Sequence, residues 1–213
     1  MWREDGSGRL WNNLFSSPKM LMEFNQANNY NTSAPKAFPR YTPEQNDEIL
    51  AAKQCNPEDS DEPCTNENVA EIFVNFSNSA SHNVRYLYDP ETNAYLRFHQ
   101  DGTPHFSYTC PTSLDQPDTK ADCGDPTQIA PKAIAVMHVQ ESTMSDGYHE
   151  NIKTIGSGDA QIFQNGDVIE GTWLKSTQDS QIVFRTQDDE EIFFAPGQLW
   201  IEAVPQFGSI DWQ

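Results

Sequence analysis

The chain has 213 residues, enough to bury a sizeable hydrophobic core, and its length corresponds to one full domain plus a fragment or arm. Thirty-two acidic residues against thirteen basic ones give a formal net charge of −19. Such a charge repels nucleic-acid phosphates and anionic membrane surfaces, so we expect no nucleic-acid partner. We find no apolar stretch long enough for a membrane span, and the residues after Met1 do not resemble a signal peptide or lipobox.

The first part of the chain predicts little regular structure. Residues 1–35 are interpreted as the end of an N-terminal domain or a docking segment. Within them, Ser17 and Pro18 are typical of the N-cap and first position of a helix, so a short helix is expected there. Residues 36–68 are rich in acidic residues and proline, which is typical of a linker or arm.

Four cysteines fall in two polar loops. Cys55 and Cys64 flank one loop, and Cys110 and Cys123 flank the other. An even number of cysteines in such loops is typical of disulfides in secreted proteins, and of the three possible pairings we expect Cys55–Cys64 and Cys110–Cys123, because each closes a short loop. A zinc site is the weaker alternative, since there is no Cys-x-x-Cys motif. Disulfides imply an oxidising compartment, and therefore an export signal upstream of this sequence.

Residues 69–213 are predicted to form a β-rich domain. Apolar residues begin to alternate at Ile72, which is the period of a strand with one buried face. Two β-prone runs at residues 84–88 and 94–99 flank a turn cluster at residues 89–93, and this arrangement predicts a hairpin.

The second half of that domain carries the clearest pattern. Residues 108–132 form a long excursion, and residues 133–140 return to strand. Asn165-Gly166 between two apolar runs is the strongest short hairpin signal, because both residues tolerate a positive φ. Turn-forming residues also separate the later apolar runs. Together with the Asn165-Gly166 signal, they predict an antiparallel meander that forms a sandwich or a small barrel. Its strands are expected at residues 160–163, 168–174, 181–186, 191–194 and 198–204.

Several of these motifs occur in a recognisable order. They are Tyr95-x-Arg97, Gly102-x-Pro104-His105, Gly156-x-Gly158-x-Ala160, Phe163-x-x-Gly166, Gly171-x-Trp173 and Pro196-Gly197-x-x-Trp200-Ile201. Their order and spacing resemble the carboxy-terminal domain of the YerB-like family of predicted bacterial lipoproteins, and residues 11–15 are similar to the exit of that family's N-terminal domain. Asn12 and Ser107 depart from the His and Asp that are usual in the family. The resemblance implies a cell-envelope protein, usually lipid-anchored through an N-terminal Cys, with a domain of unknown function.

Three residues are candidates for binding a ligand. Tyr95 and Arg97 are two apart on one predicted strand and therefore share a face, and the turn that follows folds His105 back toward them. An Arg beside an aromatic ring and a His is suited to a carboxylate or a sugar-linked anion. The alternative is that Arg97 pairs with a local acid and His105 caps the turn. We interpret Trp173 and Trp200 as core residues rather than a sugar platform.

No catalytic or metal-binding signature accompanies these candidates. His99 and His105 flank Asp101, but no short ligand motif fixes a metal geometry, and we expect neither a metal nor a cofactor. The leading hypothesis is a non-catalytic envelope or surface protein that binds a glycan, a peptidoglycan fragment or a protein partner. A hydrolase acting on cell-wall material and a structural subunit of a surface assembly are the alternatives. The sequence does not predict an oligomeric state.

Overall fold

The computed structural model describes residues 2–3, 14–15, 18–29, 37–53, 69–77, 79–107 and 124–213. The chain divides into two compact units, and each is described by itself. The first consists of Met1–Lys36 and Phe106–Gln128, and the second of Ala37–His105 and Ile129–Gln213. All four cysteines, and with them both predicted disulfides, lie outside the described residues.

The first unit contains one helix and two short strand pairs. Strand β1 (Trp2–Arg3) pairs with β2 (Leu14–Phe15), and β6 (Phe106–Ser107) pairs with β7 (Thr127–Gln128). Helix α1 (Pro18–Ala27) begins at the predicted proline, whose fixed φ suits the first turn of a helix. The N-cap proposed for it, Ser17, is outside the described residues.

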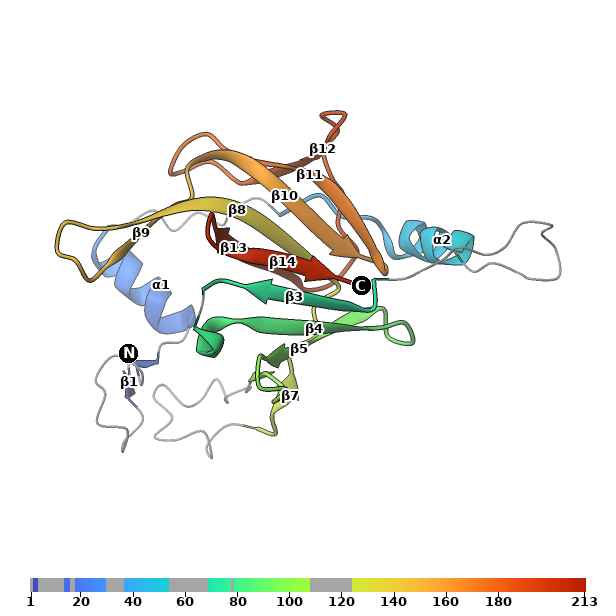
Figure 1. Ribbon diagram of the computed structural model, residues 1–213, viewed down its shortest axis with the longest axis horizontal. Coiled ribbons are helices and arrows are strands. Elements are labelled where there is room, and N and C mark those ends of the chain that lie inside the picture. The colour runs from blue at the N-terminus through green and yellow to red at the C-terminus, as the bar shows by residue number, and fades with distance from the viewer. Residues whose placement is uncertain are drawn as a thin grey trace. The chain divides into compact units, whose positions relative to one another are not determined.

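The second unit is a sandwich of two β-sheets, which confirms the predicted mainly β fold; Figure 1 shows the layers. One sheet has the order β12-β11-β10-β8-β13, with β9 pairing with β8, and the other has the order β14-β3-β4-β5. The strand bounds are β3 Glu71–Asn75, β4 Val84–Asp89, β5 Ala94–His99, β8 Ala133–Thr143, β9 Glu150–Lys153, β10 Gly156–Gln164, β11 Asp167–Lys175, β12 Val183–Thr186, β13 Leu199–Pro205 and β14 Ser209–Trp212. A 3-10 turn, η1 (Ala80–His82), precedes β4.

Both predicted hairpins are present. Strands β4 and β5 pair around the turn at residues 89–93, where Asn93 has a φ of 49°. Strands β10 and β11 pair around Asn165 and Gly166, whose φ values are 55° and 75°. Positive φ at both central residues gives the turn a twist that matches the twist of the flanking strands.

The end of the chain departs from the predicted meander. Strand β13 pairs with β8 in parallel, at the sheet edge opposite β12, and β14 then joins the other sheet beside β3. Residues 191–194 make only isolated bridges at Glu191 and Phe194. The physical reason is burial, because Phe194 is fully buried against Phe38 and Phe184, and this draws the connection across the sheet.

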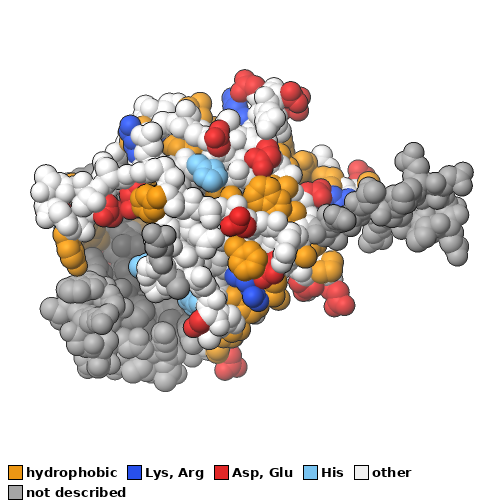
Figure 2. Space-filling model, viewed as in Figure 1, with side chains coloured by type: hydrophobic (Ala, Val, Ile, Leu, Met, Phe, Trp, Pro, Cys, Tyr) orange, Lys and Arg blue, Asp and Glu red, His pale blue; other side chains and the backbone are white. Residues whose placement is uncertain are grey.

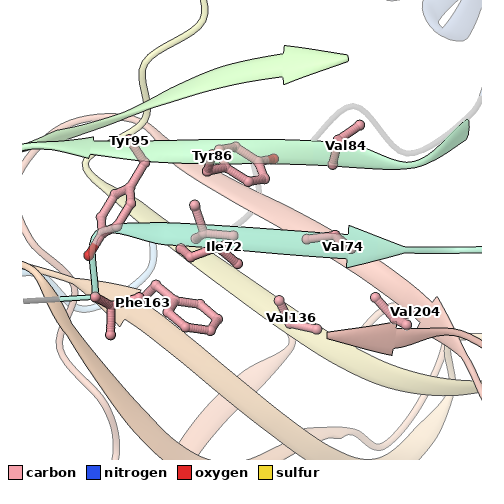
Figure 3. Packing of buried hydrophobic residues seen from close by; sticks show 10 residues of the cluster. Ile72, Val74, Val84, Tyr86, Tyr95, Val136, Phe163 and Val204 are labelled. Atoms are coloured by element: carbon pink, nitrogen blue, oxygen red, sulfur yellow. The ribbon is translucent and has the colours of Figure 1, made fainter. Parts of the chain in front are cut away.

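The larger sheet is buried on both faces. Toward the smaller sheet, Figure 3 shows Tyr95 pointing toward Phe163, and Tyr86 and Val136 belong to the same buried cluster. Toward the opposite side, Trp173 and other buried residues form a second cluster. Burial on both faces explains why β8 reads as a nearly continuous apolar run and not as an alternating one.

The acidic segment contains a helix that the linker interpretation did not include. Helix α2 (Pro43–Lys53) follows Thr42, whose hydroxyl accepts from the backbone of Gln45 at 3.2 Å while the Gln45 side chain accepts from the backbone of Thr42 at 2.9 Å. This is a capping box, a local signal that was present in the sequence. Lys53 at the other end donates to the carbonyl of Asn165 at 2.7 Å, so the helix is tied to the β10–β11 turn.

Acidic side chains are spread over the face of the molecule seen in Figure 2, whereas basic ones are few. Neither α1, with 10 residues, nor α2, with 11, has the length of a membrane-spanning helix, and the described part of the chain holds no other candidate.

Candidate functional site

The structure places the three candidate residues in one unit but does not bring all of them together. Tyr95 and Arg97 both point inward from β5 and are buried. The Tyr95 hydroxyl accepts from the backbone N–H of Gly166 at 3.1 Å, and its ring lies 5.0 Å from that of Tyr88. Burial raises the pKa of Tyr95 well above its usual range. Tyr95 is therefore a core residue that anchors the β10–β11 turn.

Arg97 lies at the centre of a buried network that links the two sheets. Its Nε donates to the hydroxyl of Tyr86 at 3.0 Å, and one Nη lies 3.4 Å from Oε1 of Glu202. The Tyr86 hydroxyl donates to the same Oε1 at 2.5 Å. The other Nη of Arg97 contacts Nδ1 of His105. An arginine only donates, so Nδ1 of His105 is the acceptor and its ring proton is assigned to Nε2.

Aromatic rings enclose this network. The guanidinium of Arg97 lies over the ring of Trp200 at 5.0 Å from its centroid, in cation–π geometry. The rings of His105 and Trp200 are 6.4 Å apart and nearly perpendicular, and the rings of His105 and His99 are 4.6 Å apart. Trp200 is thus partly buried and packs against one side of the network, and His105 connects that network to the exposed His99.

Burial and neighbouring charge shift the titration of these groups. Burial raises the pKa of Glu202, and the hydrogen bond from Tyr86 and the charge of Arg97 oppose that rise. Burial also raises the pKa of Tyr86 well above its usual range. The pKa of His105 is lowered, first by burial and then by the charges of Arg97 and His99. His105 is therefore neutral at pH 7, which matches its role as an acceptor.

A groove lined by polar residues opens beside His99. It has a volume of about 530 Å³ and is lined by Ser81, His99, Gln100, Asp101 and Thr103. Oδ1 of Asp101 accepts from the backbone N–H of Thr103 at 2.9 Å and from its hydroxyl at 2.6 Å. These bonds lower the pKa of Asp101, so its carboxylate is charged and held in place. The groove combines a fixed acceptor with groups that both donate and accept hydrogen bonds.

Two residues of the network were missed from the sequence. Tyr86 is the cross-strand partner of Arg97 in the β4–β5 hairpin, so the register of that hairpin identifies it. Glu202 shares the inward face of β13 with Trp200 and Val204. A carboxylate at an inward position between two apolar residues is a signal for a buried pair, but its partner lies on a distant strand.

The described residues hold no group of three or more His, Cys, Asp or Glu side chains placed to bind a metal ion. Trp173, interpreted as a core residue, is only 2% exposed. The prediction that Tyr95, Arg97 and His105 bind a ligand stays a prediction. Of the three, Arg97 and His105 are in contact, and Tyr95 faces the β10–β11 turn.

The chain matches a family model of unknown function. Residues 72–201 match the family model described as protein of unknown function (DUF3048) C-terminal domain. The match covers more than half of the chain, so the chain belongs to this family. It confirms the predicted kinship with YerB-like proteins.

One solved structure shares the fold. The crystal structure of the YerB protein from Bacillus subtilis aligns with a TM-score of 0.60 and 20% sequence identity. The alignment covers 99% of this chain and 59% of YerB, so this chain corresponds to part of the length of YerB. No curated protein matches the chain.

Proposed function

We propose that this protein is a non-catalytic cell-envelope protein that binds a glycan or peptidoglycan fragment in the groove beside His99. The observation that carries the proposal is the set of polar side chains around that groove, which can donate hydrogen bonds to the hydroxyl groups of a sugar and accept hydrogen bonds from them. Asp101 supplies a pre-oriented carboxylate, and the His99 ring supplies a flat face next to it.

The buried network supports binding without turnover. Arg97 and Glu202 form an ion pair at 3.4 Å, and Tyr86 bonds to both, so these groups satisfy one another. Because the two charged groups already bond to each other and to Tyr86, they form a rigid buried layer beneath the groove. They are poorly placed to activate a water molecule. In this proposal His105 connects the buried network to the groove, because its ring packs against the ring of His99.

Binding is tested with soluble peptidoglycan fragments, by titration calorimetry and by analysis of the fragments after incubation. His99→Gln with Asp101→Asn keeps the turn, because Asn replaces Asp well in such turns, and it should weaken binding at least about tenfold. Asp146→Asn with His149→Gln is the matched control, since that His–Asp pair lies 2.6 Å apart on an exposed turn elsewhere. Equal binding by both double variants would exclude this groove, and cleaved fragments would favour the hydrolase instead.

The envelope location is part of the proposal. It is supported by the YerB-like resemblance and by the two cysteine loops. Fractionation of the native cells should place the protein outside the cytoplasm. Alkylation without reductant followed by mass measurement should find no free thiol among Cys55, Cys64, Cys110 and Cys123, whereas four alkylated cysteines would remove the argument from disulfides.

A further inference from the structure

One edge of β8 pairs first with β10 and then with β9, and the hydrogen-bonded ladder on this edge is interrupted between the two. Strand β8 pairs with β10 as far as Met137, opposite Ala160, and pairs with β9 from Gln140, opposite Lys153. Residues 154–159 therefore stand opposite only residues 138–139. Such an irregularity parts the two strands locally and leaves backbone groups of β8 without ladder partners.

Trp173 occupies part of this gap. Its indole N–H donates to the carbonyl of His138 at 2.9 Å, which satisfies an acceptor that the ladder leaves unpaired. Gly158 allows the approach, because a Cβ there would lie 2.6 Å from that carbonyl oxygen and 2.7 Å from the indole nitrogen. Gly158 and Trp173, one from each of two motifs that stand out in the sequence, thus lie together at the gap.

A hollow remains beside the indole. Its volume is about 270 Å³, and its lining includes His138, Gln140, Lys153, Ser157 and Trp173. A second hollow of about 340 Å³ shares Gln140 and Lys153. The described lining of the first hollow contains no acidic residue, although acidic residues outnumber basic ones 32 to 13 in the chain. Glu141 lines only the second hollow.

Lys153 differs from the other basic residues whose side chains the structure describes. Its side chain makes no hydrogen bond or ion pair with the residues that the structure describes, whereas each of the others has an acidic or carbonyl partner. Lys53, Arg85, Arg97 and Arg185 pair with acids, and Arg40, Lys132 and Lys175 bond to backbone carbonyls. Lys153 is thus a positive charge available to a ligand in these hollows.

The orientation of His138 adds to the site. Its Nε2 lies 2.7 Å from Oε1 of Gln161, and the Gln161 amide nitrogen donates to Glu170 at 3.2 Å. The amide is therefore oriented with its oxygen toward the ring, and Nε2 of His138 is the donor. The ring is held in one position at the wall of the hollow.

We propose that this hollow is a binding site for the oxyanion end of a ligand, a carboxylate or a phosphate. Lys153 provides the opposite charge, and Gln140 and Ser157 provide hydrogen-bond donors beside it. The negative charge of the whole chain repels anions at long range, so binding depends on these short-range contacts. The site lies on β8–β10, away from the residues of the groove, and does not rest on the proposed function.

Three probes test the site by amide NMR titration: N-acetyl-alanyl-alanine with a free carboxylate, its C-terminal amide, and glycerol phosphate. Either anion should shift the resonances of Lys153, Ser157 and the Trp173 indole, and the amide should not. Which anion binds tighter separates a peptide carboxylate from a phosphate as the recognised group.

Variants separate the charge from the fold. Lys153→Gln should weaken binding at least about tenfold, as expected for the loss of a charge-assisted contact, and Lys153→Arg should retain it. Lys132→Gln is the matched control, because it removes one positive charge from a lysine that bonds to Thr92. Equal shifts with the amide, no shifts with either anion, or unchanged affinity in Lys153→Gln would each overturn the proposal.

Discussion

The buried pair of Arg97 and Glu202 leads to the sharpest prediction. Arg97→Met removes the positive partner but keeps an apolar side chain of similar length. The Glu202 side chain is only 8% exposed, and the neutral side chains of Tyr86 and Trp200 then remain to bond to it. Removing one partner of a buried pair typically destabilises a protein by about 3–5 kcal/mol, so we expect a loss in this range at pH 7.

The loss of stability in Arg97→Met should depend on pH, and the protonation of Glu202 determines whether it grows or shrinks as pH rises. Burial already raises the pKa of Glu202 above 4.5, and removing Arg97 raises it further. A carboxyl whose pKa is higher in the folded state favours folding below its unfolded pKa, and this contribution is lost as pH rises toward the folded pKa. Between pH 5 and pH 7 the gap between variant and parent should therefore widen, by up to about 2.7 kcal/mol.

Urea denaturation followed by tryptophan fluorescence at both pH values measures the gap. Arg85→Met is the matched control, because its ion pair with Glu71 is partly exposed and is worth less than about 1 kcal/mol. The double variant Arg97→Met with Glu202→Met should recover much of the loss, since no unpaired charge remains. A gap of less than about 1 kcal/mol at pH 7, or one that does not change with pH, would refute this reasoning.

Three further predictions concern single residues. Gly158→Ala should destabilise the protein by about 1–3 kcal/mol in urea denaturation, because its Cβ would displace the Trp173 indole from its carbonyl; an unchanged midpoint would contradict this. Asn165→Ala should be about 1 kcal/mol less stable than Asn165→Gly, since both lose the side-chain bonds but only glycine accepts the positive φ without strain; equal stabilities would contradict it. The pKa of His105 is lowered from 6.5, so the unfolded chain takes up a proton first, and stability is lost as pH falls below 6.5. His105→Gln, which removes the imidazole beside Arg97, should therefore lose less stability than the parent between pH 7 and pH 5, and an equal loss would contradict the assigned shift.

Much of the fold could be predicted because its signals are local. The β4–β5 hairpin follows from the turn residues that end at Asn93, and the β10–β11 hairpin follows from Asn165-Gly166. Helix α2 had an equally local signal in the capping box of Thr42 and Gln45, which the acidic composition of the segment obscured.

The candidate site could be predicted only in part. That Arg97 and His105 lie close together follows from the short turn between them. That Tyr95 faces the β10–β11 turn instead could not be predicted, because sharing a face of one strand does not determine which distant strand each side chain meets. The gap in the ladder beside Gly158 and Trp173 could not be predicted from the sequence either, although the Gly156-x-Gly158 motif was noted there.

The sequence by itself determined the mainly β class, the two hairpins and the family, because periodicity, turn chemistry and motif spacing are properties of neighbouring residues. Only the tertiary structure decided that β13 joins β8 in parallel and that β14 enters the other sheet. The same long-range pairing brings Glu202 to Arg97 and leaves Lys153 beside an open hollow. Such contacts depend on which surfaces are buried against each other, and a local sequence pattern does not determine which distant surfaces these are.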